Sequence, residues 1–289
     1  EPFEATSGIP VVGIGGSAGA LDPFKIFFKN MPADSGVAFV VIQHLAPSHE
    51  SLLPELLAQR TRMKVVQAED GTPVEPNCVY VIPPNQDLGI RDGVLYLAES
   101  LKHAGIRMPI DFFFRALAED RQERGVCILF SGAGSDGTLG MRAVRGAGGL
   151  TLAQDPGTAQ YGDMPRSAIA TKLVDRVLSP EKMPETIVEY LRQPYVRGRE
   201  FADAQGAEEQ PGGIHEILAI VRDQTGCDFR CYKRGTILRR IERRMGLHRV
   251  SEMADYAPLL RRDSGEAHQL LKDLLINVTA FFRDADAFD

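Results

Sequence analysis

The chain has 289 residues, 44% of them apolar and 25% charged, which is the composition of a globular protein with a real core. No stretch holds the roughly 20 uncharged apolar residues that a membrane span needs, and the amino terminus lacks the basic and apolar regions of a signal peptide. We therefore expect a cytoplasmic protein without membrane insertion, and the net charge of −6 argues against nucleic acid as a general partner.

Short apolar runs alternate with helical patterns up to about residue 191. Buried strands are expected at 11–13, 38–42, 79–82, 126–130 and 150–153. Helices are expected at 21–29, 51–59, 109–122 and 138–145. This alternation predicts an α/β fold with a doubly wound, Rossmann-like, mostly parallel sheet covered on both faces. One hairpin, over 88–97, is expected around the Asp92-Gly93 turn.

The segment 192–213 is rich in Pro, Gly and Glu and has no apolar period, which is typical of a linker. After it, helical patterns cover 214–224, 233–247, 253–260 and 265–277. We therefore predict an α/β domain over 8–191, a linker over 192–213 and a small all-α domain over 214–289.

Ser17 follows the first predicted strand, where residues 13–19 read GIGGSAG. The glycines permit a tight strand-to-helix turn that projects the hydroxyl at a helix N-terminus, where developing negative charge is favoured. The same segment also matches a dinucleotide-binding loop, and Ser17 is also a plausible helix cap. In a dinucleotide-binding fold the second strand should end in Asp or Glu, whereas here it ends in Gln43-His44.

His44 and Asp136 also follow predicted strands. His44 comes directly after the strand at 38–42, and Asp136 lies in a second glycine-rich turn, SGAGSDG at 131–137, after the strand at 126–130. Taken alone, His44 reads as an ordinary polar residue and Asp136 as a helix cap. Together, a hydroxyl, an imidazole and a carboxylate fall at the sheet edge where ligands bind. This set predicts a triad in which Ser17 attacks an acyl carbon, His44 transfers the proton and Asp136 orients the imidazole.

With these three motifs, the segment 8–191 resembles the CheB-type chemotaxis methylesterase domain. The resemblance implies hydrolysis of glutamyl methyl esters on methyl-accepting chemoreceptors, often with deamidation of receptor glutamines, and no cofactor for the esterase. The partners it implies are the cytoplasmic helices of those receptors. It assigns nucleophile, base and acid to Ser17, His44 and Asp136.

The resemblance also implies oxyanion donors at the backbone amides of Ala18 and Ala133, two positions where the family usually has Thr and Met. No receiver domain precedes Gly8, so we do not expect a phosphorylation switch within this chain.

The segment 214–289 resembles the amino-terminal helical domain of the CheR-type chemoreceptor methyltransferase. The residues that carry this resemblance read YKRG at 232–235, TILRRIERRM at 236–245 and NVTAFFRD at 277–284. The resemblance places Asn277, Thr279 and Arg283 beside S-adenosylmethionine. It implies a methylesterase–methyltransferase fusion truncated at Asp289, with S-adenosylmethionine bound only in a longer parent protein.

Four arginines, Arg239, Arg240, Arg243 and Arg244, fall at i, i+1, i+4 and i+5 of one predicted helix, apart from its apolar residues. This spacing predicts a cationic stripe, which is either a solvated face or a docking surface for acidic receptor helices. The histidines show no metal-ligand spacing, so no metal site is expected.

Two other classes of protein remain open at this point. One is a non-catalytic signalling scaffold whose basic helix recruits partners. The other is a nucleotide-dependent oxidoreductase that uses the first glycine-rich loop, which the Gln43-His44 strand end disfavours.

Overall fold

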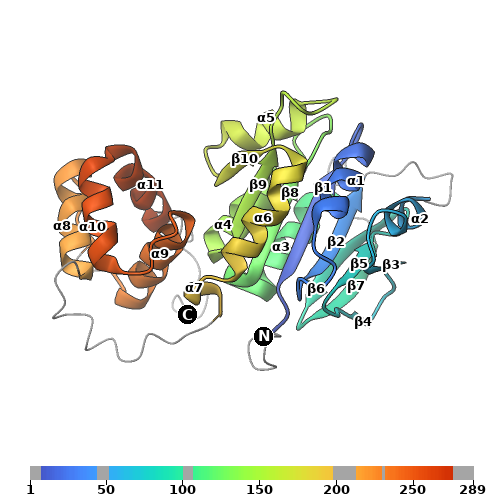
Figure 1. Ribbon diagram of the computed structural model, residues 1–289, viewed down its shortest axis with the longest axis horizontal. Coiled ribbons are helices and arrows are strands. Elements are labelled where there is room, and N and C mark those ends of the chain that lie inside the picture. The colour runs from blue at the N-terminus through green and yellow to red at the C-terminus, as the bar shows by residue number, and fades with distance from the viewer. Residues whose placement is uncertain (1–7, 44–51, 100–106, 198–212, 230–231, 276–289) are drawn as a thin grey trace, which may run out of the picture. The chain divides into compact units, whose positions relative to one another are not determined.

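The computed structural model describes residues 8–43, 52–99, 107–197, 213–229 and 232–275 (Figure 1). The chain divides into two compact units, Glu1–Arg192 and Gln193–Asp289, and each is considered by itself.

The first unit is built on a seven-stranded parallel sheet in the order β10-β9-β8-β1-β2-β5-β3. Its strands are β1 (Val11–Gly16), β2 (Ala38–Gln43), β3 (Lys64–Gln67), β5 (Cys78–Val81), β8 (Gly125–Leu129), β9 (Leu150–Gln154) and β10 (Arg176–Leu178). The predicted parallel α/β fold is confirmed. The edge strands β3 and β10 were not predicted, because they are short and largely exposed and so lack the apolar run of a buried strand.

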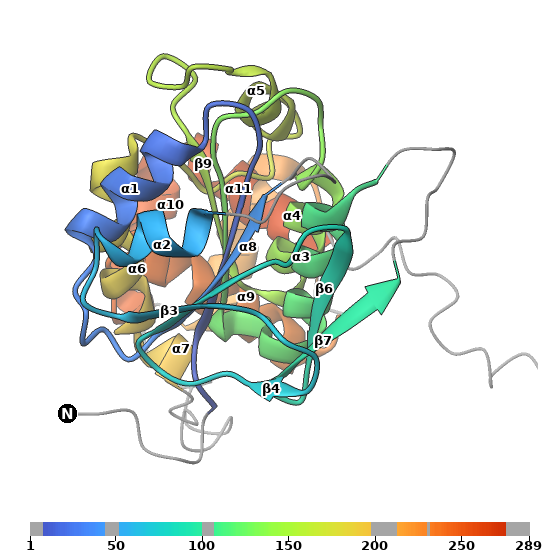
Figure 2. The same ribbon diagram turned by 90° about the vertical axis from the view of Figure 1, so that its right-hand side faces the viewer.

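Helices cover both faces of this sheet (Figure 2). One face carries α1 (Leu21–Asn30), α2 (Leu53–Ala58) and α6 (Met183–Leu191), and the other carries α3 (Pro109–Arg121) and α4 (Thr138–Ala147). A further helix, α5 (Asp163–Ala170), follows β9. The α1 side of the core is aromatic, because Phe24 and Phe27 pack edge-to-face on Phe130, and Phe27 also packs on Phe39.

Two glycines of β1 allow α3 to lie close against the strand. A Cβ at Gly13 would lie 2.8 Å from the Phe113 ring, and one at Gly15 would lie 2.5 Å from Ile110. The glycines of this strand therefore serve helix packing, while the turn that follows depends on Gly19, which has φ +71°.

A small antiparallel sheet, made by β4 (Thr72–Pro73), β6 (Gln86–Arg91) and β7 (Val94–Glu99), accompanies the main one. Asp92 and Gly93 join β6 to β7 with φ of 50° and 77°, the positive values that a two-residue hairpin turn of type I′ requires. The predicted hairpin is thus confirmed.

The second unit is helical throughout its described residues. Its helices are α7 (Pro194–Arg197), α8 (Ile214–Thr225), α9 (Arg234–Leu247), α10 (Met253–Arg262) and α11 (Ser264–Leu275). Ile217, Ile241, Tyr256 and Leu270 are fully buried in its apolar core. The short helix α7 lies inside the segment that was expected to be linker. Among the helices described in either unit, none has the length and apolarity to cross a bilayer.

Candidate active site

The candidate site lies at the switch point of the parallel sheet. From β1 the chain continues through α1 to β2 on one side, and from β8, its other neighbour, it continues through α4 to β9 on the opposite side. In open α/β sheets, ligands bind outside the carboxyl ends of the strands at such a point. Ser17 directly follows β1, and the turn over 131–137 follows β8.

The structure brings these two turns into contact. The Ser17 N–H donates to the Ser131 carbonyl at 2.9 Å. A Cβ at Gly132 would lie 3.0 Å from Ser17 Cβ, so a side chain at position 132 would crowd the serine. Gly19 is equally constrained, because an added Cβ would meet Gln160 at 2.8 Å in addition to the strain of its positive φ. Ser17 itself is partly exposed.

The backbone amides of the two turns differ in whether they are already hydrogen-bonded. The amides of Ser17 and Gly132 are occupied, by the carbonyls of Ser131 and Tyr161 respectively. By contrast, the amides of Ala18 and Ala133 make no hydrogen bond to another residue that the structure describes, and both residues are exposed. Oxyanion donors are expected from the sequence at these same two positions.

Asp136 is buried and held from one side by a helix start. Its carboxylate accepts hydrogen bonds from the N–H groups of Ile110, at 3.0 Å, and Asp111, at 2.9 Å, in the first turn of α3. One interpretation of Asp136 from the sequence is that it caps the helix that follows it. That helix, α4, begins after Gly137, which has no side chain to cap it, and Asp136 caps α3 instead.

Several candidate residues lie outside the described residues. They are His44, Asn277, Thr279 and Arg283. The residue before His44 is Gln43, the last residue of β2, which pairs in register with Gly16. The three candidate contacts of S-adenosylmethionine, Asn277, Thr279 and Arg283, thus all fall in the undescribed part of the chain.

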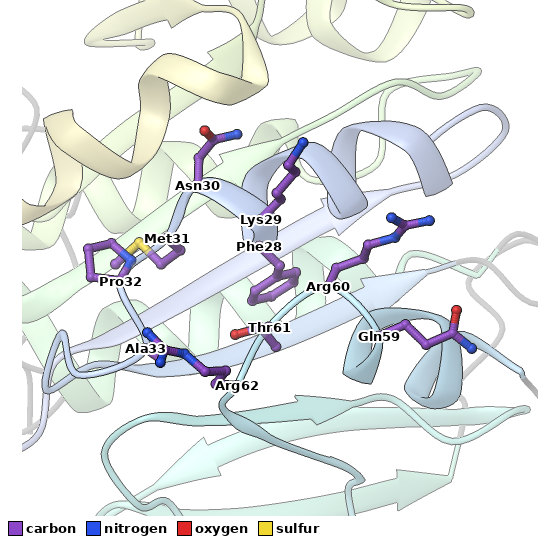
Figure 3. A pocket seen from close by; sticks show the side chains of 10 residues that line it. All are labelled: Phe28, Lys29, Asn30, Met31, Pro32, Ala33, Gln59, Arg60, Thr61 and Arg62. Atoms are coloured by element: carbon purple, nitrogen blue, oxygen red, sulfur yellow. The ribbon is translucent and has the colours of Figure 1, made fainter.

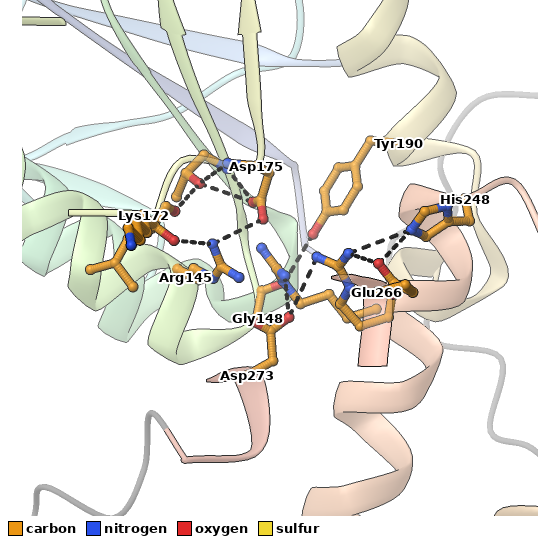
Figure 4. A network of polar contacts seen from close by, with 12 residues as sticks. Arg145, Gly148, Lys172, Asp175, Tyr190, His248, Glu266 and Asp273 are labelled. Atoms are coloured by element: carbon orange, nitrogen blue, oxygen red, sulfur yellow. Dashed lines mark hydrogen bonds and ion pairs between the residues drawn. The ribbon is translucent and has the colours of Figure 1, made fainter. Parts of the chain in front are cut away.

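The predicted cationic stripe is corrected by the structure. Arg239 is exposed, but Arg240, Arg243 and Arg244 are buried. The Arg243 guanidinium donates to Asp273 at 2.8 Å, and Arg244 makes a bidentate pair with Glu266 (Figure 4). The prediction of an exposed cationic stripe is therefore wrong for Arg240, Arg243 and Arg244. For Arg243 and Arg244 the physical reason is that α11 supplies the carboxylates with which they pair inside the second unit.

Glu266 is the centre of this buried network. It accepts hydrogen bonds from Arg244 and Tyr256, and the Nε2 atom of His248 lies 2.7 Å from its Oε2. Burial raises the pKa of Glu266, but the hydrogen bonds from His248, Arg244 and Tyr256 and the Arg244 charge outweigh it and lower the pKa to about 2. Glu266 is therefore ionised at neutral pH, and we assign the network a structural role.

A pocket of about 430 Å³ lies beside the last turn of α1 (Figure 3). Lys29, Arg60 and Arg62 line it with Phe28 and Thr61, where α1 ends. Ser17 stands before the start of the same ten-residue helix, and a helix of that length spans about 15 Å. The pocket is thus separate from the candidate site. No group of three or more potential metal ligands occurs among the described residues of either unit.

The fold defines the first unit as a doubly wound parallel α/β domain with a serine turn and an acidic turn at its switch point. Residues 12–187 match the family model for the CheB methylesterase. This match covers more than half of the chain, which therefore belongs to the CheB methylesterase family. Residues 213–275 match the model for the all-alpha domain of the CheR methyltransferase.

The chain is also similar to individual proteins. An uncharacterised 104.1 kDa protein of Rhodobacter capsulatus is 38% identical over 82% of this chain, and a protein-glutamate methylesterase/protein-glutamine glutaminase of Thermotoga maritima is 33% identical over 64% of it. The chain spans only 27% and 55% of the lengths of these two proteins. The crystal structure of the T. maritima CheB methylesterase catalytic domain superposes with a TM-score of 0.58 and 32% identity, covering 62% of this chain and 97% of that one.

Proposed function

We propose that the first unit is a protein-glutamate methylesterase that acts through Ser17, His44 and Asp136. The observation that carries this proposal is the contact between the Ser17 turn and the turn over 131–137, which holds Asp136, at the switch point of the sheet. His44 is the next residue after Gln43, whose partner in the sheet is Gly16, the residue before Ser17. All three side chains thus belong to segments that leave neighbouring strands at one edge.

The proposed reaction has two steps. His44 takes the Ser17 proton as the hydroxyl oxygen attacks the ester carbon of a glutamyl methyl ester, and then delivers it to the leaving methoxide, so that methanol departs and an acyl-enzyme remains. Water, deprotonated by His44, then attacks the acyl-enzyme and releases glutamate and the free Ser17 hydroxyl. With a receptor glutamine as substrate, the same steps release ammonia.

Asp136 would orient the imidazole and balance its positive charge. A carboxylate has acceptor sites for about four hydrogen bonds, so the two bonds from the start of α3 fix its orientation and are compatible with one more to His44. The amides of Ala18 and Ala133 would donate to the oxyanion. This role is supported by their lack of a hydrogen bond to another described residue, whereas the neighbouring amides of Ser17 and Gly132 already donate to carbonyls.

The substrates we propose are methylated glutamates on the cytoplasmic helices of chemoreceptors, which makes the cytoplasm the expected location. The esterase steps need no cofactor, because the serine, imidazole and carboxylate supply every proton transfer. Asn277, Thr279 and Arg283 remain candidate contacts for S-adenosylmethionine, which isothermal titration of the chain with that cofactor would test.

The test is methanol release from a methylated chemoreceptor fragment. Ser17→Ala and His44→Ala should each lower kcat by several orders of magnitude, and Asp136→Asn by less, because the base remains when its orientation is lost. A fluorophosphonate should label the peptide that contains Ser17 and not the one that contains Ser135. Activity of Ser17→Ala within about tenfold of the parent would contradict the triad, and an unlabelled, inactive parent would favour a scaffold.

A further inference from the structure

Ser131 joins the two turns of the candidate site through its hydroxyl. This side chain is fully buried. Its oxygen accepts a hydrogen bond from the Tyr161 N–H at 2.9 Å and donates to the Ala18 carbonyl at 2.9 Å, with the Tyr161 carbonyl as a more distant acceptor at 3.3 Å. One hydroxyl group therefore connects the turn after β1, the turn after β8 and the loop between β9 and α5.

The peptide unit that carries the Ala18 amide is held on both sides by Ser131. On one side, the Ser17 N–H donates to the Ser131 carbonyl at 2.9 Å, and on the other, the Ala18 carbonyl accepts from the Ser131 hydroxyl. Since a peptide unit is planar, fixing the peptides before and after it restricts the direction of the Ala18 N–H. That N–H, like the Ala133 N–H, makes no hydrogen bond to another residue that the structure describes.

The second proposed donor, the Ala133 amide, is held independently of the Ser131 hydroxyl. Its N–H shares a peptide plane with the Gly132 carbonyl, which accepts from the Met164 N–H at 3.0 Å. The Gly132 N–H donates in turn to the Tyr161 carbonyl at 2.9 Å. The Ala18 N–H likewise shares its peptide plane with the Ser17 carbonyl, which accepts the Ala20 N–H at 3.1 Å. Because only the Ala18 turn also has its next peptide held by the Ser131 hydroxyl, loss of that hydroxyl should disturb the Ala18 donor more than the Ala133 donor.

Gln154 fixes Ser131 from the opposite side. This side chain is also fully buried, and its Oε1 accepts the Ser131 N–H at 2.9 Å. Its Nε2 donates to the Thr158 carbonyl at 3.0 Å. The N–H, carbonyl and hydroxyl groups of Ser131 are thus all hydrogen-bonded to other segments, which restrains both its backbone and its side chain.

We propose that Ser131 is a positioning residue for the esterase, which sets the direction of the Ala18 amide toward the developing oxyanion. This inference rests on the proposed function and deepens it. The physical reason is that an oxyanion donor acts only when it lies about 2.7–3.1 Å from the charged oxygen of the transition state, and loss of one donor typically costs about 10²–10³ in kcat. A donor that is retained but misdirected should cost part of that factor.

Thr151 provides a matched control for a purely structural hydroxyl. It is fully buried in β9, and its Oγ1 accepts the Asp175 N–H at 3.0 Å and donates to the Leu173 carbonyl at 2.8 Å. Thr151 thus joins two backbone segments as Ser131 does. However, it lies near the start of its strand, while the candidate site lies at the strand ends.

The experiment compares Ser131→Ala with Thr151→Val in the full 289-residue chain. Methanol release from a methylated chemoreceptor fragment gives kcat and KM, and amide hydrogen exchange reports the freed backbone groups. We expect Ser131→Ala to lower kcat by about 10- to 100-fold with KM within about threefold, and to speed exchange at the Tyr161 amide. Thr151→Val leaves the Asp175 N–H its second acceptor, the backbone carbonyl of residue 151 at 3.0 Å, and should leave kcat within about twofold.

The outcomes separate the two proposals. If methanol release in the parent does not depend on Ser17, the proposed function fails and the role of Ser131 fails with it. If release depends on Ser17 but Ser131→Ala keeps the parental kcat, only the positioning role is overturned. The same holds if Ser131→Ala and Thr151→Val lower kcat equally. A rise in KM at constant kcat would likewise overturn it, since that would indicate a role in substrate binding.

Discussion

Asp111 and Asp136 cap each other's helices. The Asp136 carboxylate, just before α4, accepts the Ile110 and Asp111 amides at the start of α3, and the Asp111 carboxylate accepts the Gly140 amide in the first turn of α4 at 2.7 Å. Both carboxylates are buried, with residue exposures of 3% and 2%. The exchange fixes the proposed catalytic acid to two helices at once, and it brings two carboxylates into one buried site.

The first prediction concerns the charge of Asp111. Burial raises the pKa of Asp111 above its ordinary value, and the Asp136 charge adds to the rise, while the hydrogen bonds from Gly140 and the charge of Arg115 oppose it. Since the folded pKa exceeds the unfolded one, the contribution of this group is greatest below the unfolded pKa and is lost as pH rises through the folded pKa. Asp111→Asn, which retains an acceptor for Gly140, should therefore be as stable as the parent or more stable at pH 7.

That advantage of Asp111→Asn should shrink as pH falls through the acidic range in which Asp111 becomes protonated, and urea denaturation across pH measures it. Asp111→Ala is the control, because it removes the cap as well as the charge and should destabilise the chain by about 0.5–2 kcal/mol. If Asp111→Asn loses as much stability at pH 7 as Asp111→Ala does, then burial of the charged Asp111 carboxylate does not cost the parent stability.

The second prediction concerns the packing of α3 on α4. A Cβ at Gly140 would lie 2.4 Å from Phe114 Cβ and 3.1 Å from the Asp111 carbonyl oxygen, so Gly140→Ala must push the two helices apart. We expect a loss of about 1–3 kcal/mol in the free energy of unfolding. Methanol release should fall as well, because the mutual caps hold Asp136.

The control is Gly235→Ala in α9, where an added Cβ meets nothing within 4 Å. Because alanine favours helix over glycine, this change should be neutral or gain up to about 1 kcal/mol. Equal effects of the two substitutions on the denaturation midpoint would mean that α3 and α4 are not in tight contact at Gly140.

The third prediction concerns the buried pair of Arg244 and Glu266. Glu266→Gln removes the charge that balances Arg244, and breaking a buried pair in this way typically costs about 3–5 kcal/mol. The matched control is Glu216→Gln, whose partner Arg261 is more than half exposed, and a surface pair of this kind contributes about 0–1 kcal/mol. Thermal or urea denaturation followed by the helical signal gives both values.

The effect of Glu266→Gln should depend on pH. With the folded pKa lowered from 4.5 to about 2, ionised Glu266 contributes stability that is complete above the unfolded pKa and lost as pH falls through the folded one. The difference between parent and Glu266→Gln should therefore be full at pH 7 and diminish between those two pKa values. A difference that does not change over this range would exclude the charge of Glu266 as its cause.

The fourth prediction separates the exposed arginine of α9 from its buried neighbours. Arg243→Ala should destabilise the chain by about 3–5 kcal/mol because buried Asp273 loses its hydrogen-bonded cation and keeps only Arg244 at 4.0 Å. Arg239→Ala should change stability by no more than about 0.5 kcal/mol. If α9 docks on an acidic receptor helix, Arg239→Glu should weaken that binding at low salt. Unchanged affinity at low salt would identify Arg239 as an ordinary solvated residue.

Local pattern in the sequence determined the class of fold and the central strands and main helices of this chain, but not the edge strands β3 and β10. The apolar runs that became β1, β2, β5, β8 and β9 are short and bounded by turn residues, and this signal does not depend on distant contacts. It also placed Ser17 and Asp136 after strand ends. Because parallel strands end at one edge, the location of the candidate site followed from that class of fold.

Only the tertiary structure decided which residues hold the site together. The Ile110 amide that Asp136 accepts lies 26 residues earlier in the chain, and the hydroxyl that restrains the Ala18 peptide comes from Ser131, 113 residues away. In the same way, the spacing of arginines in α9 predicts a solvated stripe until Glu266 and Asp273 are brought against it by α11. Such partners are fixed by packing between segments far apart in sequence, where hydrogen bonds and counter-charges offset the cost of burial, and a local pattern carries no record of them.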